Sequence, residues 1–182
     1  MLPSSTPKAT LADIDKLLKP YRKALEGESL IVVGIPGYYS KMGTSPGNDR
    51  AIYDDAMFVV SPTHFSAWNA NVDPSLFRKG IATLAPGIHR YRKGNHGISR
   101  PGGGYPAFRP ATKNEELPVT RDGVAVPWPG VAINIHRGGN TTTSSLGCQT
   151  IPPAQWDAFY AAVSGEMKRH NLKTFPYVLV TA

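Results

Sequence analysis

The sequence contains a single cysteine, Cys148, among 182 residues. One thiol excludes a disulfide within the chain and a zinc site built from several cysteines. No apolar run approaches the roughly 20 residues that a membrane span needs. The N-terminus also lacks the charged and then apolar pattern of a secretory signal. We therefore expect a protein made in the cytoplasm, without a signal peptide and without membrane association.

Neither sign of charge forms a block, although positive charge is in excess. The chain has 20 Lys and Arg against 13 Asp and Glu, for a formal net charge of +7. The basic residues are dispersed and no recognised nucleic-acid motif is present, so we expect no nucleic-acid partner. A positive protein is instead attracted to anionic polymers over a long range.

Glycine and proline are abundant, with 18 and 17 residues respectively. Such a composition favours short strands and loops over long helices. The length suits one domain with its own core. We predict a mainly β protein with a few helices, of the α+β class, in which residues 1–9 are disordered and residues 10–182 form a single domain.

Hydrophobic periodicity predicts two helices and several strands. Thr10 with Asp13 forms a capping-box pattern that predicts a helix from Leu11, ended or kinked by Pro20. Pro153 fits the first position of a second helix. The predicted strands are 30–35, 57–61, two strands within 80–91, a hairpin within 117–127, 131–135 and 175–181.

Two other stretches are predicted to be loops. Residues 34–55 are rich in Gly and Pro, and we expect Asp49, Asp54 and Asp55 to brace this loop, with a metal site there as the alternative. Residues 65–74 have the composition of turns.

Residues 93–111 are the richest in glycine and proline and predict a flexible flap over a cleft. In this flap, Tyr105 is a candidate to stack on a substrate or hydrogen bond to it. Arg100 or Arg109 is a candidate to bind a carboxylate.

The stretch from Val131 to Pro153 carries the candidate chemistry. The apolar run before His136 predicts a buried strand, so that His136 would lie where this strand ends. Cys148 follows after a loop of eleven residues. The adjacent Gly147 has no side chain, which would let a substrate carbonyl approach the Cys148 sulfur and the backbone N–H groups next to it. An imidazole next to a thiol can take its proton, which makes sulfur a nucleophile.

At these residues the sequence resembles the L,D-transpeptidase catalytic-domain family, also called YkuD. Ser145-Leu146-Gly147-Cys148 is similar to the Ser-His-Gly-Cys motif of that family, and residues 133–136 are similar to its histidine-bearing strand. The resemblance implies a β-sandwich, with Cys148 as nucleophile and His136 as base. Leu146 replaces the second histidine of the motif, and Gln149-Thr150 replaces the hydrophobic residue and arginine that usually follow the cysteine.

The candidate site therefore comprises catalytic and substrate-binding residues, with no cofactor and no metal. The catalytic candidates are Cys148, His136 and Gly147. The candidates for substrate binding are Tyr105, Arg137, Gly138, Ser144, Ser145, Gln149 and His96.

The resemblance, together with the passages 48–56 and 144–150 that look like those of tailed phages and prophages, implies a bacteriolytic function. We expect a monomeric, endolysin-like cysteine peptidase that waits in the host bacterial cytoplasm and then cleaves an amide bond in peptidoglycan. Three alternatives remain open at this point. They are a true L,D-transpeptidase or injected antibacterial effector, a non-catalytic phage structural or wall-binding protein, and a zinc peptidase using His136, Cys148 and His96.

Overall fold

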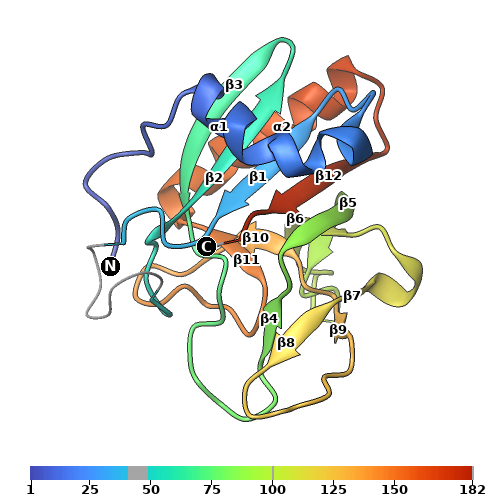
Figure 1. Cartoon of the computed structure of the whole chain (residues 1–182). Helices are drawn as coiled ribbons and strands as arrows, with labels where there is room; N and C mark the ends of the chain where they lie inside the picture. Colours follow the sequence, from blue (N-terminus) through green and yellow to red (C-terminus); the bar gives the residue numbers. More distant parts are fainter. Residues whose placement is uncertain (41–48, 100, 182) are drawn as a thin grey trace.

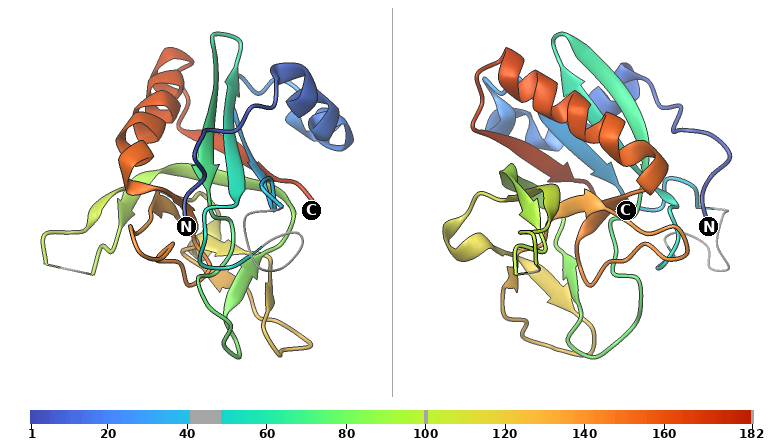
Figure 2. Two further views of the ribbon diagram at one scale, coloured as in Figure 1. Left: turned by 90° about the vertical axis from the view of Figure 1, so that its left-hand side faces the viewer. Right: turned by 180° about the vertical axis from the view of Figure 1, so that it is seen from behind.

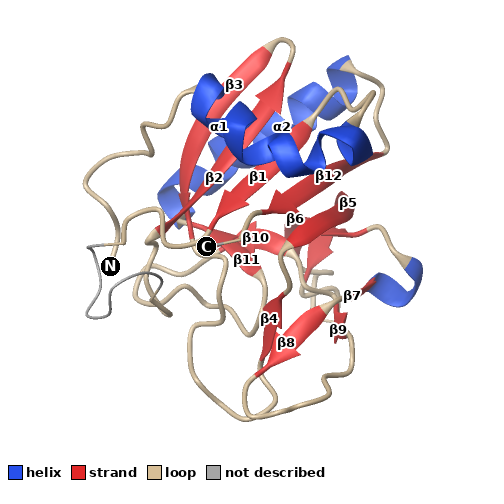
Figure 3. Ribbon diagram, viewed as in Figure 1, coloured by secondary structure: helices blue, strands red, loops and turns tan. Residues whose placement is uncertain are grey.

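The computed structural model describes residues 1–40, 49–99 and 101–181, and within them the chain is mainly β, of the α+β class (Figures 1 and 3). The helices are α1 (Leu11–Leu18), the 3-10 helices η1 (Lys19–Leu25) and η2 (Lys113–Glu115), and α2 (Pro153–Arg169). The strands are β1 (Ile31–Ile35), β2 (Asp55–Ser61), β3 (His64–Ala70), β4 (Ala82–Leu84), β5 (Gly87–His96), β6 (Tyr105–Pro110), β7 (Glu116–Leu117), β8 (Val119–Arg121), β9 (Gly130–Val131), β10 (Ile135–Arg137), β11 (Gln149–Ile151) and β12 (Thr174–Leu179).

Most strands belong to one eight-stranded sheet in the order β11-β10-β6-β5-β12-β1-β2-β3. Two further sheets have two strands each, β4 with β8 and β7 with β9. The large sheet bends far enough for its two ends to meet: the backbones of Asn71, just after β3, and Thr150 in β11 exchange two hydrogen bonds of 2.8 Å. The strands that carry the candidate site therefore lie next to the end of the β2–β3 hairpin.

The two α-helices cover opposite faces of the sheet, as the left view of Figure 2 shows. Side chains alternate along a strand, so neighbouring residues enter different cores. Val32 belongs to the same buried cluster as Trp156 and Phe159 of α2, whereas Val33 belongs to the cluster that contains Ile14 of α1. Burial on both faces explains why β1 and β2 are continuous apolar runs.

The helix signals of the sequence are confirmed. Thr10 accepts a hydrogen bond from the backbone of Asp13, and the Asp13 carboxylate accepts one from the backbone of Thr10, which is the predicted capping box. Pro20 lies at the start of η1, where the chain changes from α to 3-10 geometry. The second helix begins at Pro153 as predicted.

Several predicted loops and strands differ from the structure. Residues 64–70 form β3, since pairing with β2 outweighs their polar composition. The predicted hairpin within 117–127 is wrong: β8 pairs with β4 rather than with the residues after Asp122-Gly123, apart from one bridge between Arg121 and Val124. The flap of residues 93–111 is largely the paired strands β5 and β6, and Arg100 lies outside the described residues.

Residues 1–9, predicted to be disordered, follow a defined path along the sheet. The Tyr38 hydroxyl accepts hydrogen bonds of 2.9 Å from the backbone N–H groups of Lys8 and Ala9, and the Tyr39 hydroxyl donates to Ser5. Two tyrosines thus hold a segment whose own composition carries no signal for order. No helix among the described residues combines the length and the apolar character of a membrane span.

Candidate active site

Four neighbouring strands bring the candidate residues together. His96 ends β5, and Tyr105 begins β6 directly opposite it. His136 is the central residue of β10, which pairs with β6 at one side and with β11 at the other. Cys148 immediately precedes β11. The prediction that a strand covering 131–135 ends at His136 is therefore wrong, because Ala132, with a φ of 53°, separates β9 from β10.

The loop between β10 and β11 carries the chain back to the level at which β10 begins, so that the two strands run parallel. Gly147 makes this possible, since its φ of 134° is rare for any residue with a side chain. A Cβ atom there would also approach the Ala82 carbonyl oxygen to 2.8 Å. The backbone N–H of Gly147 donates to the Ser145 hydroxyl at 3.0 Å. Gly147 therefore shapes the turn, and its N–H is hydrogen bonded within the protein.

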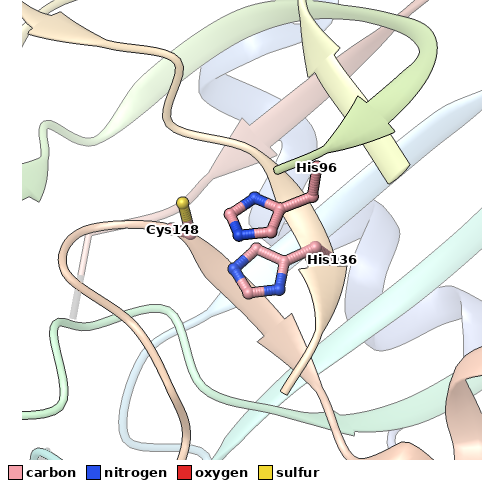
Figure 4. Close-up of side chains that lie close together, drawn as sticks. All are labelled: His96, His136 and Cys148. Atoms are coloured by element: carbon pink, nitrogen blue, oxygen red, sulfur yellow. The ribbon is translucent and has the colours of Figure 1, made fainter. Parts of the chain in front are cut away.

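Cys148, His136 and His96 form a compact cluster (Figure 4). One ring nitrogen of each histidine and the Cys148 sulfur all lie within 4.8 Å of one another. The two imidazole rings stack, with centroids 3.9 Å apart and planes inclined by 17°. His136 is buried, whereas His96 and Cys148 are partly exposed. The structure thus brings the predicted pair together and places His96 directly over His136.

The orientation of the His136 ring is set by its Nδ1 atom. Nδ1 lies 2.7 Å from the Arg137 carbonyl oxygen and 3.0 Å from the Tyr105 hydroxyl, which itself donates to that carbonyl at 3.2 Å. A carbonyl only accepts, so Nδ1 carries the proton and Nε2 has the lone pair. Figure 4 shows the Nε2 edge turned toward Cys148. Tyr105 therefore contacts His136 in this structure.

Asn134 is a part of the site that sequence reasoning missed. Its backbone N–H lies 3.4 Å from the Cys148 sulfur, and its side-chain nitrogen lies 3.0 Å from His96 Nδ1. Asn134 is only 2% exposed. The available signal was the one polar residue inside the apolar run 131–135, because a buried amide needs partners.

The electrostatic environment keeps the Cys148 thiol protonated in the resting protein. Burial raises the pKa of the thiol to about 11, while the hydrogen bond from Asn134 and the positive charge of Arg109 oppose this rise. Arg109 was predicted to bind a substrate carboxylate, but it is 8% exposed and forms an ion pair with Glu115. Its guanidinium therefore has a partner within the protein.

The other predicted substrate-binding residues divide into two groups. Ser145 and Gln149 are buried: Ser145 Oγ donates to the Cys148 carbonyl at 2.6 Å, and the Gln149 side chain bonds to Val72, Gly147 and Tyr177. These hydrogen bonds hold the cysteine loop in place, and contact of the two residues with a substrate stays a prediction. Arg137 and Ser144 are exposed beside the site, and the Arg137 guanidinium lies 5.1 Å from the centre of the Tyr105 ring.

Gly138 is close to the Tyr53 hydroxyl, with no room for a side chain, and its N–H donates to Ile151 at 2.9 Å. Gly138 is half-buried, next to the exposed Arg137.

The acidic residues of the 34–55 region brace the backbone. Asp55 is fully buried and accepts hydrogen bonds from Gly37 at 2.7 Å and Val72 at 2.6 Å, and burial and the neighbouring Asp73 raise its pKa well above the usual value. Asp54 accepts from the backbone of Asp49 at 2.7 Å, and burial raises its pKa to about 6. The 41–48 part of this predicted loop lies outside the described residues.

Among the described residues, the His, Cys and carboxylate side chains that converge closely enough to hold a metal ion are His96, His136 and Cys148. Comparisons of the chain with family models, with curated proteins and with solved structures found no match.

Proposed function

We propose that this protein is a cysteine-dependent peptidoglycan hydrolase that cleaves an amide bond of murein stem peptides or cross-links. The observation that carries the proposal is the convergence of the Cys148 sulfur and the ring nitrogens of His136 and His96 within 4.8 Å, at a partly exposed position. A nucleophile, a base and a group that orients the base are the parts required for acyl transfer. His136 has such an orienting group in the Arg137 carbonyl.

The reaction begins with the protonated thiol, since its pKa is about 11. His136 Nε2 takes the proton as sulfur attacks the amide carbonyl carbon, and a tetrahedral intermediate forms. The C–N bond then breaks, the imidazolium returns the proton to the leaving amine, and a thioester remains on Cys148. His136 next removes a proton from water, whose oxygen attacks the thioester, and the thiol is restored with that proton.

The choice of peptidoglycan rests on two sequence features. Residues 133–136 and 145–148 resemble the motifs of the L,D-transpeptidase family, and the net charge of +7 suits an anionic cell-wall polymer. If an amine replaces water in the second half-reaction, the same site exchanges peptides, so L,D-transpeptidation is the second candidate. An endolysin-like function, with storage in the host cytoplasm and release by other factors, belongs to the same proposal.

The test is mass spectrometry of purified muropeptides after incubation with the protein. If the bond is hydrolysed, the masses of the products add up to the mass of the substrate plus one water. If the site accepts an amine, an excess of a D-amino acid gives an exchange product that contains this amino acid. Cys148→Ser and His136→Ala should each abolish both products. The matched control is His64→Ala, at the far end of the β2–β3 hairpin, which should retain activity. Unchanged products with Cys148→Ser would refute the proposal.

A further inference from the structure

The cluster that contains the nucleophile also has the composition of a transition-metal site. Two imidazole nitrogens and one thiol sulfur are ligands that Zn²⁺ prefers. Bonds of about 2.0–2.1 Å to nitrogen and about 2.3 Å to sulfur place tetrahedral ligand atoms roughly 3.3–3.7 Å apart. The three atoms here lie within 4.8 Å of one another, and turning the two stacked rings so that their Nε2 atoms converge would bring them into this range. Partial exposure of His96 and Cys148 leaves room for a fourth ligand such as water.

The contact at His136 is of the kind found at metal-ligating histidines. A ligating histidine usually donates its other ring N–H to a carbonyl or carboxylate, which fixes the ring and its tautomer. His136 Nδ1 has this relation to the Arg137 carbonyl at 2.7 Å. This contact directs the Nε2 lone pair of His136 toward the space shared with Cys148 (Figure 4).

A flipped Asn134 amide would supply the equivalent support to His96. The amide group lies 3.0 Å from His96 Nδ1, while its Oδ1 atom is buried and has no hydrogen-bond partner among the described residues. Rotation of the amide by half a turn would let Oδ1 accept the Nδ1–H of His96. His96 Nε2 would then carry a lone pair on the same side as His136 Nε2. The unpaired buried oxygen is an independent indication that this tautomer is accessible.

We propose that His96, His136 and Cys148 bind one Zn²⁺ ion, and that the bound ion holds the protein inactive. In the binding step the Cys148 S–H bond breaks, a sulfur–zinc bond forms, and the proton is released to solvent. The ion is then bound to the Cys148 sulfur and to the His136 nitrogen, both of which the cleavage reaction needs. The binding part stands on the geometry of the cluster, whereas the inhibition part rests on the proposed function.

Binding is tested on the metal-free, full-length protein with two probes, Zn²⁺ by calorimetry and Co²⁺ by absorption spectroscopy. We expect one ion per chain and a cobalt–thiolate charge-transfer band. Cys148→Ser should abolish the band, and His96→Ala or His136→Ala should weaken binding at least tenfold. His64→Ala is the matched control with unchanged affinity, and circular dichroism checks that each variant is folded. Absence of stoichiometric binding, or binding that none of the three substitutions weakens, would overturn the site.

Inhibition is tested by muropeptide cleavage at increasing Zn²⁺, with chelator added afterwards. We expect cleavage to fall over the concentration range in which calorimetry shows binding, and chelator to restore it. Cleavage that persists with the site filled, or that requires Zn²⁺ and is lost in chelator, would overturn the inhibitory role. If metal-free protein cleaves but binds no ion, only this inference fails. If the cobalt band forms but no metal state cleaves muropeptides, the proposed function fails and the metal site stands.

Discussion

Raising the pH should destabilise the folded protein through Cys148, and this contribution should be missing in Cys148→Ala. Burial raises the pKa of the thiol to about 11 from an ordinary value of 9.0. The folded state therefore retains a proton that the unfolded chain releases. Because the folded state binds more protons, the free energy of unfolding falls as the pH rises above the unfolded pKa, and this fall ends above the folded pKa.

The size of the effect follows from the two pKa values. At pH 10 the thiolate of the unfolded chain outnumbers the thiol about tenfold, whereas in the folded protein the thiol outnumbers the thiolate. This difference corresponds to a loss of about 1.4 kcal/mol relative to neutral pH. At neutral pH both states hold the proton, so the contribution is absent there.

The measurement is urea denaturation of the wild type and Cys148→Ala at pH 7 and pH 10, both with chelator. Tyrosines and lysines titrate in both proteins and cancel in the comparison. The difference in unfolding free energy between the two proteins should shift by about 1.4 kcal/mol, to the disadvantage of the wild type. A difference that stays constant would show that the thiol is not desolvated. A shift in the opposite direction would indicate a thiolate already formed in the folded protein.

Three further substitutions test the supports of the site and of the fold. Gly147→Ala should destabilise the protein by about 2 kcal/mol or more in urea denaturation, because a positive φ and the nearby Ala82 carbonyl both oppose a Cβ atom; wild-type stability would contradict this structure of the turn. Tyr105→Phe should lower kcat about tenfold with little change in KM, since the lost hydroxyl orients His136, and a change in KM alone would instead indicate substrate binding. Glu166→Gln should destabilise the protein by about 3 kcal/mol at neutral pH, because hydrogen bonds lower the pKa of Glu166 to about 2 from an ordinary 4.5. This contribution is present above the unfolded pKa of 4.5, so the difference in stability between the two proteins should close as the pH falls toward 2. A gap independent of pH would contradict that last assignment.

The parts of the fold that sequence predicted correctly are those decided by local interactions. The capping box of Thr10 and Asp13 begins α1, and Pro153 begins α2, because each residue acts on backbone groups within one turn. β1 was recognisable because burial on both faces demands a continuous apolar run.

The parts that were missed depend on partners far away in the chain. β3 is polar enough to resemble turns, and only its pairing with β2 makes it a strand. The break at Ala132 interrupts the mostly apolar run of residues 131–135, because residues 130–131 pair with β7 while residues 135–137 pair with β6 and β11.

The site shows the same division. Cys148 and His136 were predicted from a short spacing, but the stacking of His96 on His136 arises from the alignment of β5, β6 and β10. His96 is 52 positions before Cys148, and no local pattern joins them. The burial of Ser145 and Gln149 could not be predicted from the sequence either, since it follows from packing of the loop against residues 72–82.

The central claim is that the Cys148 sulfur attacks an amide carbonyl and forms a thioester. Intact-protein mass spectrometry after acid quenching of metal-free protein with tetrapeptide muropeptides tests it most directly. We expect an added mass equal to the substrate minus its leaving amine, located on Cys148 by peptide mapping and missing from Cys148→Ala and His136→Ala. Cleavage products formed at an undiminished rate by Cys148→Ala, with no adduct on the wild type, would contradict the account.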